Sequence, residues 1–326
     1  MPRFRLGILF LFSATALLPG CATQDGGGSG FSLLPKSLQK APATHMTVIT
    51  EMTDAGRTVP APTAESAAYY AIQSIDYHNE GTEYGRNKAM PLPAVEGLLR
   101  RALADSHYLP ADSSHPAELV MVLICGSANT IDNRINPGFA TGNGTPSQSL
   151  PSIAFPNGVS TNPGNADTGA DVPQPPEDVM GVNDIATRQN FLLRARLVGG
   201  DKFSDAVANV LLQQDQFLRT GSGVAAMQPL ELFESSDPTV RLLVEQTKGD
   251  RYYVVASVYG AGRLTHGQPK LLWRTKMTAS SEGVTMAETF PALVNGARSF
   301  FGRDMSHAVI LPELLPRNGH PALAAQ

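Results

Sequence analysis

The sequence predicts an α+β domain, with a mixed β-sheet, a βαβ unit, a C-terminal β-hairpin, packed helices and an inserted αα-hairpin. Three observations indicate this fold class. Apolar and polar residues alternate in short runs that end at glycine or proline, which is typical of strands. Longer segments space their apolar residues three or four apart, as on the buried face of a helix. Hydrophobic residues make up 42% of the chain, which is enough for a sizeable core.

The first part of the domain predicts a strand, a helix and a strand. Alternation is weak over 46–52 and clearer over 67–77, and both segments predict strands. The segment 91–106 predicts a helix, because its leucine and valine residues share one face. The apolar run 118–125 predicts a buried strand. At this spacing, the second strand, the helix and the third strand form a βαβ crossover.

The composition changes after this strand. Eight prolines occur from Pro137 to Pro176, and glycine, asparagine, serine and threonine fill most of the remaining positions. A segment of this kind buries too little apolar surface to offset its ordering entropy. Structureless segments this long inside a compact domain are functional or disordered. We therefore predict a disordered insertion at 127–183, where mild proteolysis should cut first.

Two helices joined by a glycine turn are predicted after the insertion. The first covers 184–199 and the second begins at Asp201, which gives an αα-hairpin. Arg188, Arg194 and Arg196 lie on the first helix. They have two interpretations, a patch for an anionic ligand or lipid headgroup, and a solvated helix face, which we favour.

The last part of the domain predicts a helix, a hairpin and a final helix. Asp237 followed by proline is typical of a helix start. The runs 251–260 and 270–279 predict the hairpin, and the first of them is apolar on both faces, which indicates a central strand. A capping box begins the final helix at Thr285. We expect Gly302 to end that helix.

Two residues of the predicted core have competing interpretations. Trp273 is the only tryptophan. We expect it to be a core residue between the sheet and the final helix, in contact with Phe290 or Leu293, although tryptophan is also common at binding hot spots. Cys125 ends an apolar strand, so we expect a small buried side chain rather than a reactive thiol.

Few residue patterns predict chemistry. Asp76, His78 and Glu80 alternate at a strand end, so their side chains share one face, and carboxylate–imidazole–carboxylate sets suit a divalent metal. A solvated strand end is the favoured alternative, because a metal site needs further ligands. We find no catalytic or phosphate-binding motif, and we expect no cofactor. A non-enzymatic domain is therefore favoured.

The N-terminal segment resembles a bacterial lipoprotein signal peptide. Arg3 and Arg5 precede an apolar run that is too short to cross a bilayer. The run ends in Leu18, Pro19, Gly20 and Cys21, which resembles a lipobox. The resemblance implies cleavage between Gly20 and Cys21 and acylation of Cys21, with several lipid chains for a stable anchor. Ala22 after the cysteine implies the outer membrane, on its periplasmic side.

The expected organisation follows from these segments. Residues 1–20 are a signal peptide, 21–43 a lipid-anchored flexible tether, and 44–312 a single α+β domain that contains the insertion at 127–183. Residues 313–326 form a loose C-terminal tail. Without the signal peptide, 23 basic and 29 acidic residues give a net charge of −6. A mildly acidic domain without a basic stripe is not expected to bind nucleic acid.

The domain itself resembles uncharacterised bacterial envelope lipoproteins over residues 46–305, outside the insertion. The likeness rests on core strands and a helix end, namely Val254 to Ser257, Leu271 to Thr275 and Phe300 to Gly302. It implies a fold and no catalytic residues. We expect a binding or assembly module that is anchored to the membrane by its lipid and binds an envelope protein partner. The alternative is an envelope hydrolase or ligand-binding protein with a pocket between the αα-hairpin and the sheet.

Overall fold

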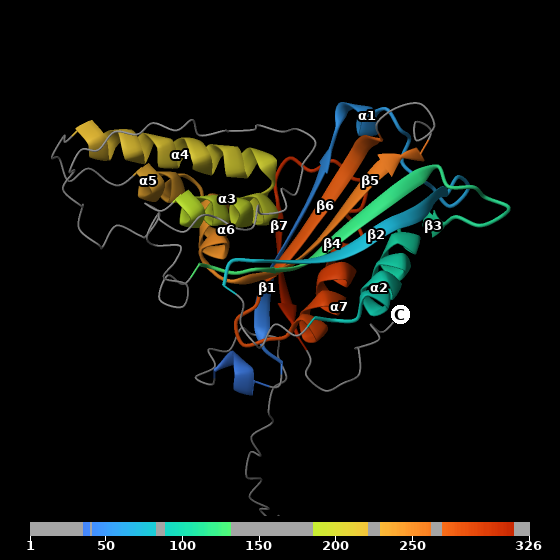
Figure 1. Cartoon of the computed structure of the whole chain (residues 1–326), viewed down its shortest axis with the longest axis horizontal. Coiled ribbons are helices and arrows are strands. Elements are labelled where there is room, and N and C mark those ends of the chain that lie inside the picture. The colour runs from blue at the N-terminus through green and yellow to red at the C-terminus, as the bar shows by residue number, and fades with distance from the viewer. Residues whose placement is uncertain are drawn as a thin grey trace, which may run out of the picture. The chain divides into compact units, whose positions relative to one another are not determined.

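The computed structural model describes residues 35–39, 41–82, 89–131, 185–220, 229–261 and 269–315. These residues belong to one compact unit. The predicted signal peptide, with Gly20 and Cys21, lies outside the described residues, as does most of the predicted insertion. The described part confirms the α+β fold class (Figure 1).

A seven-stranded mixed sheet forms the centre of the fold. Its strand order is β3-β2-β4-β5-β6-β1-β7. The strands are β1 (Ala43–Met52), β2 (Ala68–Glu80), β3 (Tyr108–Pro110), β4 (Leu119–Ala128), β5 (Arg251–Gly260), β6 (Lys270–Ser280) and β7 (Val309–Leu314).

The predicted βαβ unit is present. Strands β2 and β4 pair in parallel, and the chain between them passes through helix α2 (Leu92–Ala104) and the short strand β3. A register shift between Ile72 and Ser74 interrupts the pairing. Strand β4 runs to Ala128, so the first residues of the predicted insertion belong to the sheet.

The predicted hairpin is also present. Strands β5 and β6 pair antiparallel, and β5 is the central strand of the sheet. Helix α7 (Met286–Ala297) begins with the predicted capping box, in which Glu288 N donates to Thr285 Oγ1 and Thr285 N donates to Glu288 Oε2. The helix ends at Ala297, earlier than the apolar spacing predicted, and Gly302 follows in the left-handed conformation with φ of +66°.

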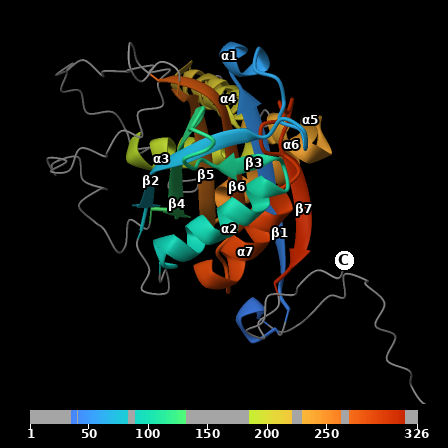
Figure 2. The ribbon, with the colours of Figure 1, turned by 90° about the vertical axis from the view of Figure 1, so that its right-hand side faces the viewer.

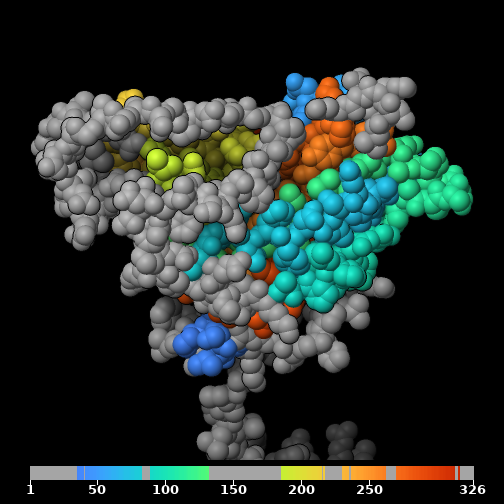
Figure 3. All heavy atoms as spheres, viewed as in Figure 1, coloured from blue at the N-terminus to red at the C-terminus, as the bar shows by residue number. Residues whose placement is uncertain are grey.

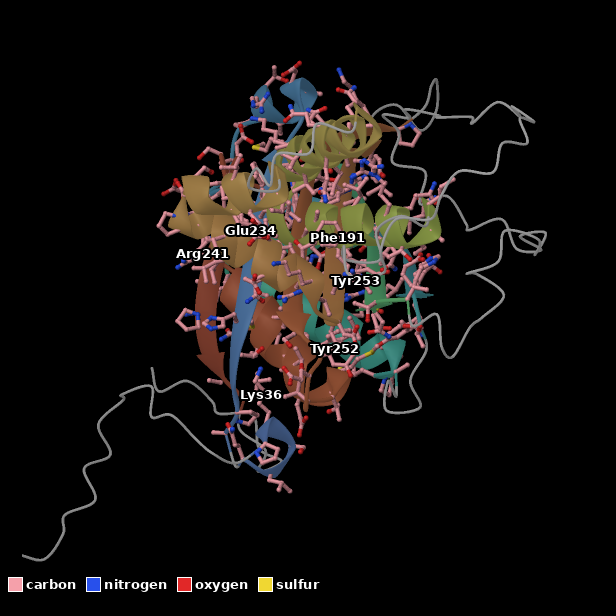
Figure 4. The ribbon with its side chains drawn as sticks, turned by 90° about the vertical axis from the view of Figure 1, so that its left-hand side faces the viewer. Lys36, Phe191, Glu234, Arg241, Tyr252 and Tyr253 are labelled. Atoms are coloured by element: carbon pink, nitrogen blue, oxygen red, sulfur yellow. The ribbon has the colours of Figure 1, made fainter. Side chains whose placement is uncertain are left out.

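Helices cover both faces of the sheet. On one face, α2 and α7 lie side by side (Figure 2) and pack on the largest apolar cluster, which includes Met121, Val254 and Phe290. On the other face, α3 (Ile185–Gly199) contacts β1, β4 and β6. Tyr252 and Tyr253, neighbours on β5, belong to the clusters on these opposite faces (Figure 4).

Three further helices pack on α3 or on one another. The αα-hairpin is confirmed, because α4 (Asp201–Thr220) follows α3 after one residue, Gly200, whose φ is +88°. Helices α5 (Pro229–Ser236) and α6 (Pro238–Lys248) complete the layer. Asp237 is the predicted N-cap of α6 and accepts a 2.6 Å hydrogen bond from Thr239 N.

Sequence patterns missed several elements. Strand β7 pairs antiparallel with β1, so Glu313 and Leu314 belong to the sheet and the loose tail predicted from 313 is wrong for them. The predicted tether also ends earlier, because residues 36–38 form the 3₁₀ helix η1 (Lys36–Leu38), in which Figure 4 labels Lys36. Lys36 Nζ lies 3.5 Å from Glu282 Oε2. Helix α1 (Asp54–Arg57) and helix α5 were not predicted.

Trp273 and Cys125 are both core residues, as predicted. Trp273 is 3% exposed, and its ring partners are Tyr108 and Phe301, at centroid distances of 5.4 and 6.2 Å, whereas the ring of Phe290, one of the two predicted contacts, pairs with that of Tyr252. Burial raises the pKa of the Cys125 thiol to about 12, so the thiol stays protonated at neutral pH.

Candidate functional site

A cleft of about 440 Å³ opens where three connecting segments meet. Its lining comes from residues 61–62 before β2, residues 105–108 after α2, and residues 298–299 and 301–303 after α7. A volume of this size suits a small-molecule ligand. The cleft therefore lies at the C-terminal ends of two helices, and not between the αα-hairpin and the sheet.

The α2 side of the cleft depends on an unusual backbone conformation. Helix α2 ends at Ala104, and His107 N donates to Ala104 O at 3.0 Å. His107 has φ of +62°, the only positive value among described residues other than glycine. A left-handed residue is a common way to end a helix, but glycine or asparagine usually occupies it. Strain of this kind in non-glycine residues concentrates at functional sites.

The α7 side requires a glycine. A Cβ atom at Gly302 would lie 1.9 Å from Tyr108 Oη, and the positive φ of Gly302 also disfavours a side chain. A hydrogen bond of 2.5 Å from Ser106 Oγ to Arg298 O joins the two sides of the cleft. The hydroxyl of Ser106 is therefore committed to a backbone carbonyl.

Aromatic side chains form the floor of the cleft. Tyr108 and Phe301 both line it and are both buried, and both contact the ring of Trp273 behind them. Burial raises the pKa of Tyr108 to about 12, with an opposing effect from its hydrogen bond with Trp273. The phenol is therefore neutral at physiological pH, and its hydroxyl is available to donate a hydrogen bond.

Four ionisable side chains surround this floor, namely those of Asp105, His107, Arg298 and Arg303. None of the four has an ion-pair or hydrogen-bond partner within the part of the chain that the structure describes. Asp105 and both arginines are exposed, and His107 is half-buried.

A second charged cluster connects the αα-hairpin to the sheet. Lys276 on β6 is fully buried, and its Nζ lies 2.6 Å from both Glu51 Oε2 on β1 and Asp201 Oδ1 at the start of α4. Asp201 N also donates to Glu51 Oε1 at 2.6 Å. Burial alone raises the pKa of Asp201, but Lys276, Arg196 and Arg274 outweigh it, and the pKa is lowered from 3.8. The ions of this cluster satisfy one another, which indicates a structural role.

Buried arginines hold the C-terminal end of helix α6. Arg194 Nε donates to Thr247 O at 2.8 Å, and Arg251 Nη1 donates to Gln246 O at 3.2 Å. Burial lowers the pKa of Arg194 to about 10 and that of Arg251 to about 9, and for Arg251 the charge of Arg194 adds to the effect. The last carbonyls of a helix lack partners inside it, and these guanidinium groups supply them.

The favoured interpretation of the predicted arginine patch is therefore wrong for one of its members. Arg194 is 4% exposed and packs inside the domain, with its guanidinium 6.0 Å from the centre of the ring of Phe191, the residue that Figure 4 labels on α3. Arg196 Nε lies 3.5 Å from Asp201 Oδ1, and Arg188 is half-buried. Because Arg194 is buried, the three do not form one solvated face.

The predicted metal candidates share one face of β2, a strand that Figure 3 shows at the surface in cyan. Asp76, His78 and Glu80 alternate in the register with β4, and Asp76 is exposed. Burial raises the pKa of Glu80, with an opposing effect from His78. Among the residues that the structure describes, no three His, Cys, Asp or Glu side chains are grouped to hold a metal ion.

A serine–histidine pair that sequence patterns did not indicate lies before β7. Ser306 Oγ and His307 Nδ1 are 2.8 Å apart, and the charge of His307 contributes to the lowered pKa of Asp237, whose main cause is the hydrogen bond from Thr239 N. Ser306, His307 and Asp237 are all exposed. Such a pair acts in hydrolases from an enclosed site that excludes water, so the exposure of these residues argues against catalysis.

Comparison with known proteins gives no family. No protein-family model matches this sequence, and the search of curated proteins found no match either. Within the described helices, none combines the length and apolar character that a membrane span needs. The cleft is therefore interpreted from its own residues.

Sequence reasoning missed the cleft because its lining is discontinuous. The strongest local signal was the run Asp105 to Tyr108, four hydrogen-bonding side chains at the end of a predicted helix. No sequence pattern connects that run to Arg298 and Arg303. Only the packing of α2 beside α7 brings the two segments together.

Proposed function

We propose that this chain is a lipid-anchored lipoprotein of the bacterial cell envelope, and that its α+β domain is a non-enzymatic binding module whose binding surface is the cleft. The observation that carries the binding role is the state of the cleft's polar groups. Four ionisable side chains, which have no partners among the residues that the structure describes, surround an aromatic floor. Pockets that bind small molecules combine apolar walls with a few such groups.

Binding is favoured over hydrolysis by the same geometry. A serine hydrolase needs a serine hydroxyl bonded to a base, and a third group that orients the base. In the cleft, Ser106 Oγ donates to Arg298 O instead of His107. The His107 ring has no orienting partner within the described residues. The cleft therefore has groups that can hold a ligand, without an activated nucleophile among them.

The anchor is proposed from the sequence. The basic residues, the apolar run and the small residue before Cys21 support cleavage and acylation there. Ala22 supports sorting to the outer membrane, with the domain in the periplasm. An envelope protein partner is part of this proposal.

Replacement of Cys21 tests the anchor. Cells that produce the wild-type chain should incorporate labelled palmitate into it and retain it in the outer-membrane fraction. The Cys21→Ser variant should incorporate none and accumulate as unprocessed precursor. Mass spectrometry that shows a mature chain without lipid, cut at another position, would refute the anchor.

A fluorophosphonate probe tests binding against hydrolysis, because it labels only activated serines. We expect no labelling of the folded wild-type chain at Ser106 or Ser306. Labelling that is lost in Ser106→Ala would make the cleft a hydrolase site. Labelling that is lost only in Ser306→Ala would move the activity to the serine–histidine pair before β7.

A further inference from the structure

We propose that the cleft binds its ligand through an oxyanion group, a phosphate or a carboxylate, that Arg298 and Arg303 hold together. This inference rests on the proposed binding function and gives the class of ligand. The two arginines lie five residues apart on the segment after α7 and line the same cleft. Their guanidinium groups lack protein partners within the described chain.

Arginines at several other positions are neutralised by the protein. Arg57 Nη1 lies 2.8 Å from Asp54 Oδ1, and Arg57 Nε lies 2.8 Å from Asp304 Oδ2. The side chain of Arg100 is held by Glu96, four residues before it on the same helix. The cleft lining contains one carboxylate, Asp105, against two guanidinium groups, and Asp105 pairs with neither in the described structure. The cleft therefore has an excess of one positive charge.

The chemistry of these groups selects an oxyanion. A guanidinium group presents its N–H donors in a planar fork that matches a carboxylate or phosphate. The hydroxyls of Ser299 and Tyr108 line the same cleft and can donate further hydrogen bonds. Phe301 and Pro62 offer apolar surface for the carbon body of the ligand.

A purely structural role for Arg298 is the main alternative. Arg298 is the C-cap of α7, and a positive charge there complements the helix dipole. Arg303 lies beyond the helix, and its N–H donates to Phe300 O. The dipole accounts for Arg298 alone, so the two explanations differ in what they predict for Arg303.

The sole tryptophan provides the measurement. Trp273 contacts Tyr108 and Phe301, which both line the cleft, so a ligand on this floor should change its emission. The full chain in an uncharged detergent is titrated with inorganic phosphate and with succinate. Sodium chloride at equal ionic strength controls for screening. We expect a saturable change with at least one oxyanion and none with chloride.

Substitutions then assign the response to the guanidinium groups. Arg303→Gln should weaken binding about tenfold, and the double variant with Arg298→Gln by about a hundredfold, because each removes a charge-assisted contact. Arg303→Lys, which keeps the charge and loses the fork, should also weaken binding. The matched control is Arg241→Gln, an exposed arginine on α6 that is not part of the cleft lining (Figure 4), and it should bind as the wild type does.

Two sources of the oxyanion are then separated. Short-chain phosphatidylglycerol, used below its micelle concentration, should compete with phosphate if the natural ligand is a lipid headgroup, and phosphatidylcholine of equal length should not. Competition by neither lipid assigns the site to a soluble ligand. Both results support oxyanion binding.

Three results would overturn the proposal. The first is the absence of a saturable response to either oxyanion. The second is equal binding by wild type and Arg303→Gln. The third is a set of arginine variants that lower Tm without weakening oxyanion binding. Circular dichroism confirms that each variant is folded, and Arg303→Gln serves if the double variant is not. If the chain is acylated at Cys21 but shows no response to either oxyanion, the ligand class is refuted and the proposed anchor stands. If the chain responds but is not acylated, the anchor is refuted and the ligand class stands.

Discussion

Replacing Lys276 by methionine should lower the free energy of unfolding by about 2–3 kcal/mol. The Lys276 Nζ atom has no exposure to solvent and is 2.6 Å from one carboxylate oxygen of Glu51 and one of Asp201. Methionine keeps most of the side-chain volume and removes the charge. The substitution therefore leaves two carboxylates facing each other where the αα-hairpin meets the sheet.

The magnitude follows from the geometry. The two carboxylate oxygens can be at most twice 2.6 Å apart, since each lies 2.6 Å from Nζ. Two unit charges about 5 Å apart repel by about 3 kcal/mol at an effective dielectric constant of about 20. The side chains of Glu51 and Asp201 are 24% and 50% exposed, so water screens part of this repulsion. A value somewhat below the usual cost of breaking a buried pair is therefore expected.

Urea unfolding, followed by circular dichroism and by the emission of Trp273, measures the loss. Adding Glu51→Gln and Asp201→Asn to Lys276→Met should recover part of it, because removing all the charges is less costly than removing one partner. Arg100→Gln, which breaks a partly exposed pair on α2, is the control and should change stability by less than about 0.5 kcal/mol. A single variant as stable as wild type would refute the structural role of Lys276, as would a triple variant no better than the single one.

Three further predictions concern the charged cluster, the core and the cleft. The folded-state pKa of Asp201 is lowered, so the stability that this carboxylate provides is complete above its unfolded pKa of about 3.9 and is lost as the pH falls through the folded-state pKa. Between about pH 5 and 3, the Tm of wild type should therefore fall more steeply than that of Asp201→Asn. Trp273→Ala should lower the free energy of unfolding by about 3–5 kcal/mol. The emission of Trp273 in the wild type should be blue-shifted and poorly quenched by iodide, and a red-shifted, readily quenched emission would contradict its burial. Gly302→Ala should lower the free energy of unfolding by about 1–3 kcal/mol. Adding Tyr108→Phe should recover part of this loss, because it removes the oxygen that lies 1.9 Å from the new Cβ. If nothing is recovered, the whole loss comes from the strained backbone of residue 302.

Local sequence signals predicted the elements that depend on local physics. The hairpin of β5 and β6 was predicted within one residue at each end, because alternation and apolar content mark a buried strand over its whole length. Asp237 and Thr285 were predicted as helix starts, since a capping side chain acts on backbone groups two or three residues away.

Elements that depend on distant partners were missed. Strand β7 contains Pro312, which reads as the end of ordered structure, yet β7 is an edge strand, and an edge tolerates a residue that cannot donate to a neighbour on its open side. Arg194 looks like an ordinary surface cation in the sequence. Its guanidinium instead donates to Thr247 O at the end of α6, 53 residues later in the chain, which no pattern around Arg194 indicates.

Trp273 shows that one residue can belong to the core and also support the floor of the cleft. Its ring is buried, yet the two rings that bury it, those of Tyr108 and Phe301, are also the floor of the cleft. We expect a ligand on that floor to bind only when the core beneath it is assembled, so its binding energy should add to the stability of the folded chain. An oxyanion held by Arg298 and Arg303 should therefore raise the Tm of wild type. The same ligand should raise the Tm of Trp273→Ala less, because the floor of its binding site is no longer supported.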